Sequence, residues 1–121
     1  MPTGISSTFA IVSNDTVAAG QTLTITNPGR TMRVVSIRVR GTGTAFVAAS
    51  KGAAGALGVA FASGAIAAAP ISGWTELTIT YAQATILSTD EIRITSSGGT
   101  VNECIIECVG NQSQTLTAVV A

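Results

Sequence analysis

Apolar and polar residues alternate along much of this chain, as they do in a β-strand with one buried and one exposed face. The clearest alternation runs from Thr31 to Arg40. Its apolar residues fall on one face and its polar residues on the other: Val35, Ile37 and Val39 against Ser36, Arg38 and Arg40. The preceding stretch, Gln21 to Thr26, alternates too, and Asn27 to Gly29 supplies turn residues between the two. We therefore expect these stretches to be partner strands.

The same period of two recurs toward the C-terminus. Further strands are predicted for 43–50, 74–81, 84–87, 90–95, 100–109 and 114–120. In one of them Leu77, Ile79 and Tyr81 share a face. The Gly- and Ala-rich segment 52–69 fits either strand or loop, because small side chains give little contrast between faces. Roughly eight to ten short strands without a helix, at the spacing typical of a sandwich or barrel, predict an all-β fold, which we expect to be an antiparallel β-sandwich.

The sequence predicts one domain. Residues 8–121 carry the strand pattern, whereas Met1 to Ser7 contains Pro2 and Gly4 and resembles a short extended arm. Such arms often become ordered only against a neighbour. We therefore place Pro2 and Ile5 among the candidate interface residues.

The low charge content indicates an unusual surface. Only 10% of residues are charged, against about 25% in an ordinary domain, so Thr, Ser and Ala must cover much of the outside. A formal net charge of +0 argues against a nucleic-acid partner, which requires clustered Lys and Arg. The uncharged run 52–74 is rich in Gly and contains Pro70, which argues against a membrane span. Together with the absence of a secretory pattern, this predicts synthesis in the cytoplasm.

The few charges are unevenly distributed. Five of the six cations precede residue 52, and five of the six anions follow it. One interpretation is that these are scattered, solvated side chains, which contribute little individually. The alternative is head-to-tail complementarity between subunits.

Candidate chemistry is sparse. The chain has no His, the commonest general base and zinc ligand. Cys104 and Cys108 lie about 13 Å apart if they share a strand, too far for a disulfide, and are expected on the core face beside Ile106. Glu103 and Glu107 are expected to be exposed on the opposite face. We predict no catalytic, cofactor-binding or metal-binding residue, and hence no enzyme.

Three further residues are candidates for a partner interface. Arg38 and Arg40 share the polar face of their strand, which is either solvent-exposed or a docking surface. Trp74 is the only tryptophan. We expect it in the core or at the core edge, with an interface anchor as the alternative.

The strand entries GQTLTIT (20–26) and STDEIRIT (88–95), the neutral Thr- and Ala-rich alternation and the N-terminal arm resemble the small decoration, or cement, proteins of tailed-phage capsids. This resemblance implies a jelly-roll-like subunit, often a homotrimer, on the virion surface. Its implied partners are itself and the major capsid protein, whose neighbouring capsomers it braces. The alternative is a carbohydrate-binding or adhesin module of a fibre, although aromatic residues make up only 4% of the chain.

Overall fold

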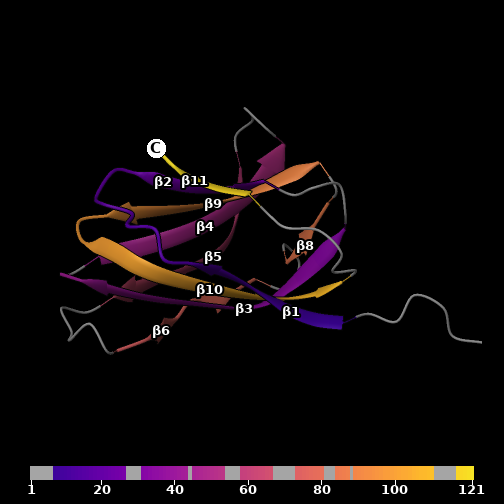
Figure 1. Ribbon diagram of the computed structural model, residues 1–121, viewed down its shortest axis with the longest axis horizontal. Helices are drawn as coiled ribbons and strands as arrows, with labels where there is room; N and C mark the ends of the chain where they lie inside the picture. The colour runs from indigo at the N-terminus through magenta and orange to yellow at the C-terminus, as the bar shows by residue number, and fades with distance from the viewer. Residues whose placement is uncertain are drawn as a thin grey trace, which may run out of the picture.

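The computed structural model consists mainly of β-strands, and no helix occurs in the ranges it describes (Figure 1). These ranges are 7–26, 31–43, 45–53, 58–66, 73–80, 84–87, 89–110 and 117–121. The strands are β1 (Ser7–Ser13), β2 (Thr22–Thr26), β3 (Met32–Thr42), β4 (Ala45–Ala53), β5 (Val59–Ile66), β6 (Thr75–Glu76), β7 (Thr78–Ile79), β8 (Thr85–Ile86), β9 (Asp90–Ser97), β10 (Thr100–Gly110) and β11 (Thr117–Val120). All of their pairings are antiparallel.

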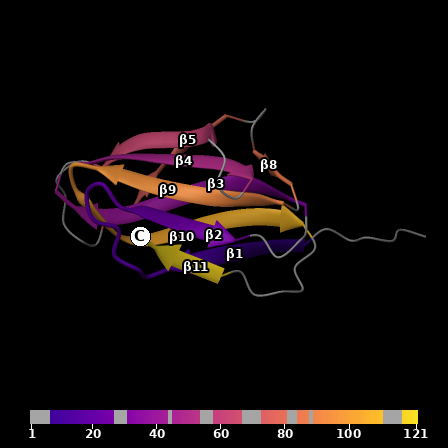
Figure 2. The same cartoon turned by 90° about the horizontal axis from the view of Figure 1, so that it is seen from above.

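The strands form two sheets that pack face to face. Sheet A has the order β1-β10-β3-β6, with β8 also paired to β3, and sheet B has the order β11-β2-β9-β4-β5-β7. Figure 2 shows sheet B lying across sheet A. Among the described strands, only β4 and β5 are both consecutive and paired with each other. The chain otherwise crosses from sheet to sheet, as in a jelly roll, which confirms the predicted antiparallel sandwich.

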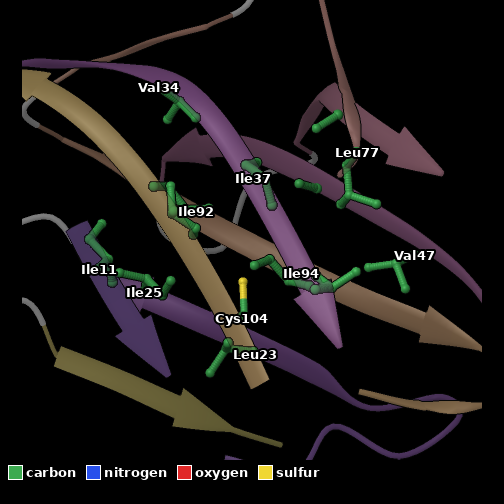
Figure 3. Close-up of a cluster of buried hydrophobic side chains, with 14 of the residues drawn as sticks. Ile11, Leu23, Ile25, Val34, Ile37, Val47, Leu77, Ile92, Ile94 and Cys104 are labelled. Carbon is green, nitrogen blue, oxygen red and sulfur yellow. The ribbon is translucent and has the colours of Figure 1, made fainter. Parts of the chain in front are cut away.

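The core fills the space between the sheets with aliphatic side chains. Figure 3 shows Leu23 and Ile25 of β2 together with Ile92 and Ile94 of β9, all fully buried. These residues meet in register, Leu23 opposite Ile94 and Ile25 opposite Ile92. The two strand entries noted in the sequence are thus neighbours in sheet B.

One predicted pairing is wrong. β2 and β3 are not partners, because β2 lies between β11 and β9 in sheet B while β3 belongs to sheet A. Alternation shows that each strand has one apolar face. Both strands bury that face equally well when they cover the core from opposite sides, as the sandwich requires.

The predicted inward face of β3 is also partly wrong. Val34 is fully buried, whereas Val35 is 40% exposed. The register with β10 explains this, since Ser36 pairs with Glu107 but Val34 pairs with Cys108, which leaves Val35 as an extra residue. This β-bulge shifts the alternation by one position. Beyond it, Ile37 and Val39 point inward as predicted.

The stretch 74–81 is not one strand. β6 pairs with β3 in sheet A, and β7 pairs with β5 in sheet B. Between them Leu77 is buried, and its N–H donates to the carbonyl oxygen of Ile37 at 2.8 Å. The chain therefore passes from one sheet to the other at Leu77. Ile79 is half-buried, and Tyr81 lies outside the described residues.

The ambiguous Gly/Ala segment contains a strand. β5 occupies residues 59–66 between β4 and β7. Its register shifts where Ala49 pairs with Ala62 but Ser50 pairs with Ala60, so that Phe61 is the extra residue. Both Phe61 and Ala62 are buried as a result. Of the predicted arm, residues 1–6 lie outside the described ranges, and Ser7 is the first residue of β1.

Candidate functional site

The outer face of sheet A gathers four charged residues on two neighbouring strands. β3 and β10 pair along most of their lengths, with Arg40 opposite Glu103, Arg38 opposite Ile105 and Ser36 opposite Glu107. The intervening residues of both strands point the other way and are buried in the core. They include Ile37, Val39, Cys104 and Ile106. We call the outer surface that carries Arg38, Arg40, Glu103 and Glu107 the charged face.

The four residues form two ion pairs. Arg40 binds Glu103 directly across the strands, and Arg38 binds Glu107 diagonally. All four side chains are between about one quarter and one half exposed. Glu103 and Glu107 lie on the outer face as predicted, but each is only about one quarter to one third exposed, because an arginine from β3 covers part of its carboxylate.

These pairs also explain much of the uneven charge distribution. Cations from the first half of the chain and anions from the second half meet because β3 and β10 are neighbours in one sheet. For Arg38, Arg40, Glu103 and Glu107 the complementarity is thus within one chain. Neither interpretation from the sequence, scattered solvated side chains or complementarity between subunits, describes these four residues.

Trp74 extends the charged face toward its β6 edge. It is 40% exposed, so the expectation of a core position is wrong. It lies immediately before β6, which pairs with β3 through Arg38 opposite Glu76 and Val39 opposite Thr75. The guanidinium carbon of Arg40 lies 4.9 Å from the centre of the indole ring, a cation–π contact. Arg40 is thereby held between a carboxylate and an aromatic ring.

Apolar side chains are interspersed with these charges. Val12 of β1 is 58% exposed and lies in one cross-strand row with Ile105 and Arg38. Val35 borders a hollow formed with residues of the crossover between β6 and β7: Glu76, Leu77, Thr78 and Ile79. Sequence reasoning missed Val12 because it predicted no strand over residues 7–13. It missed Val35 because the bulge turns this side chain from the predicted inner face to the outer face.

The predicted interface residues are therefore partly brought together. Arg38, Arg40 and Trp74 lie on one continuous surface of sheet A. Pro2 and Ile5 lie outside the described residues. The outer face of sheet B presents Thr, Ser and Ala together with the exposed Phe46 and Val119, and it carries the ion pair of Arg93 and Glu91 at 3.1 Å.

The nucleophilic groups lie away from this surface. Cys104 and Cys108 are buried, and burial raises the pKa of each thiol to about 12. Asp90 accepts a hydrogen bond from the N–H of Leu87 at 2.9 Å, while Glu91 pairs with Arg93. Within the described ranges, no three acidic, Cys or His residues cluster as metal ligands would. The arrangement on the charged face is suited to contact with another molecule.

No protein-family model and no curated protein matches this chain. In the part of the chain that the structure describes, there is no helix with the length and hydropathy needed to cross a membrane.

Proposed function

We propose that this protein is a structural accessory protein that associates with itself and docks on a larger assembly through the charged face. More specifically, we propose a decoration or cement protein at a virion surface, bracing neighbouring capsomers of the major capsid protein. The observation that carries the proposal is the half-exposed Trp74 stacked with Arg40 beside exposed valines.

The residue types on this face and the restrained conformations of its arginine side chains both support docking. Trp and Arg are enriched among the residues that dominate binding energy. Arg40 and Arg38 are already held by Glu103 and Glu107, so less side-chain freedom is lost when a partner arrives. Val12 and Val35 add apolar area that a partner would remove from water.

The remainder of the surface supports self-association. With 10% charged residues and a net charge of +0, little repulsion separates copies of this chain. The resemblance to cement proteins supplies the virion setting and favours a trimer. Neither the setting nor the number of copies follows from the charged face.

Light scattering over a concentration series tests self-association. We expect a mass that is an integral multiple of the chain mass and does not change on dilution. A monomer at every concentration would contradict the proposal.

Pelleting with undecorated tailed-phage capsid shells tests docking. We expect Trp74→Ala to lower the bound fraction and Thr95→Ala, on the outer face of sheet B, to leave it unchanged. Equal binding by both variants would contradict docking through the charged face.

The second candidate is a carbohydrate-binding module, and the exposure of Trp74 is the observation that favours it. Sugars stack on aromatic rings, and Glu76 and Arg40 lie nearby to hydrogen-bond hydroxyl groups. Arg40, however, already occupies a position over the indole ring. Glycan-array binding that is lost in Trp74→Ala would favour this function over docking on a shell.

A further inference from the structure

The two sides of the sandwich end in very different edge strands. On one side the sheets end in β6, β7 and β8, which have two residues each. On the other side they end in β1, with seven residues, and β11, with four. Figure 2 shows β1 and β11 along the same side. Short edge strands limit pairing with other chains, so the β1 side is the less protected one.

The sequence of β1 lacks the charged residues and prolines that often block an exposed edge. Its sequence, STFAIVS, contains no charge, no Pro and no Gly. Among the described strands, only β10 pairs with it. Every second N–H and C=O group of an edge strand points away from its one neighbour. The backbone of β1 can therefore accept a further strand.

The order of residues in β1 identifies that strand. Around Ala10 the sequence is symmetric in residue type, with hydroxyl residues at Ser7 and Ser13, β-branched residues at Thr8 and Val12, and large apolar residues at Phe9 and Ile11. In a two-fold contact centred on Ala10, position i meets position j and position j meets position i, so each of these residues would lie opposite one of the same type.

We propose that β1 pairs antiparallel with β1 of a second copy of this chain, about a two-fold axis at Ala10. In this register Thr8 faces Val12, Phe9 faces Ile11 and Ala10 faces itself. Cross-strand pairs of β-branched and aromatic residues stabilise sheets. The small residue lies on the axis, where a side chain meets its own copy.

This inference rests on the proposed function and specifies its self-association. Pairing at β1 joins the two copies of sheet A into one sheet and places both charged faces on the same side. A dimer of this kind would dock through two charged faces at once, which raises avidity without new contacts. It predicts closure at two copies in place of the trimer that the resemblance favours.

The charges on the joined sheet permit this arrangement. Ala10 lies opposite Glu107 in the register of β1 with β10, so the two copies of Glu107 would be about 14 Å apart, three strand spacings. Each carboxylate is paired with Arg38 of its own chain. Repulsion between the copies is therefore small.

Disulfide trapping tests the register. Directly opposite residues in an antiparallel pair have Cα atoms about 4.5–5.5 Å apart, within the range of a disulfide. Ala10→Cys should therefore form a covalent dimer with oxidised glutathione, which takes up the two electrons and two protons of the thiols. Val12→Cys is the control, because its two copies would lie about 14 Å apart along the strands. The buried Cys104 and Cys108 should not react in the folded protein.

Charge reversal at the axis supplies an independent test. Ala10→Lys and Ala10→Glu each place like charges opposite each other, and we expect about a tenfold weaker dimer for each. Mixing the two variants in equal amounts should restore dimers by pairing Lys with Glu. Thr95→Lys adds the same charge away from every edge and should leave the dimer unchanged.

The outcomes separate this inference from the proposed function. A stable oligomer in which Ala10→Cys does not cross-link faster than Val12→Cys overturns β1 pairing and leaves self-association intact. A monomer at every concentration overturns both. Cross-linking at Ala10 together with rescue by the mixed variants supports the two-fold contact.

Discussion

At the scale of single residues, the charged face is organised around Arg40. This guanidinium pairs with Glu103 and stacks with Trp74, so two weak attractions hold one long side chain in place. Each is modest because the groups are partly solvated, with about 0.2–1 kcal/mol for an exposed ion pair and a similar value for the cation–π contact. The cluster therefore favours an ordered surface and adds little to stability.

Trp74→Ala should for this reason leave the fold largely intact. We expect the free energy of unfolding to fall by about 1 kcal/mol or less, since the ring is 40% exposed and its main partner is itself at the surface. Urea denaturation measures this. A loss above about 3 kcal/mol, typical of a core aromatic, would contradict the surface position.

Val34 and Val35 provide a direct test of the bulge in β3. Val34→Ala should lower the free energy of unfolding by about 2 kcal/mol, because it leaves a cavity in the core. Val35→Ala removes the same atoms from a side chain that is 40% exposed and should change stability by about 0.5 kcal/mol or less. The reverse order in urea denaturation would show that the alternation continues without a bulge.

The buried thiols predict a loss of stability in alkali. Burial raises the pKa of Cys104 and Cys108 to about 12, well above the ordinary value of an exposed thiol. Above about pH 9 the unfolded chain loses these protons while the folded chain retains them. The contribution of the thiols to the free energy of unfolding is therefore fully present below pH 9 and is lost as pH rises toward 12. The slope should approach about 1.4 kcal/mol per pH unit for each thiol.

Unfolding measured between pH 8 and pH 11 checks this dependence. The double variant Cys104→Ala, Cys108→Ala should lose the contribution of both thiols. An unchanged slope in this variant would assign the alkaline loss to other groups.

At the scale of elements, β3 and β10 are the longest strands, with 11 residues each, and they form the centre of sheet A. They carry both ion pairs of the charged face on one side and much of the core on the other. Two register shifts interrupt their pairing, and each changes which residues face outward. The geometry of this one strand pair therefore determines the composition of the candidate site.

The close approach of these strands at Gly41 should be intolerant of substitution. A Cβ atom there would overlap the backbone carbonyl oxygen of Thr100, so Gly41→Ala should cost about 3 kcal/mol or more as the strands separate. Gly20→Ala is the matched control, since its φ of +84° disfavours Ala but no atom lies within 4 Å. That variant should cost about 1 kcal/mol. Equal losses in thermal or urea unfolding would contradict the close packing.

At the scale of the whole molecule, the jelly roll separates the two surfaces for which we propose different roles. The charged face covers the outside of sheet A, whereas the proposed self-association uses the β1 edge of the same sheet. Substitutions should therefore affect them independently. Ala10→Lys should shift light scattering toward the monomer mass, and Trp74→Ala should leave the oligomer unchanged while weakening docking on capsid shells. A monomeric Trp74→Ala would show that the charged face itself joins the copies.

Alternation in the sequence was enough to predict where most strands lie and which of their residues enter the core. In β2, β9 and the C-terminal half of β10 the buried residues follow the alternation read from the chain. The reason is local, because the pleat of a single strand sends successive side chains to opposite faces. The low charge content and the separation of Cys104 from Cys108 likewise follow from composition and spacing.

Which strands pair, where the bulges fall and what the charges contact depend instead on the assembled fold. β2 and β3 follow one another but lie in different sheets, and Arg40 meets Glu103 across more than half of the sequence. Strand partners are selected by filling one core from both sides, which depends on all strands together. A bulge at Val35 arises from the same pairing, so no local pattern could reveal it. The position of Trp74 beside Arg40 follows from the pairing of β6 with β3. Alternation describes each of these segments separately and does not show that they are in contact.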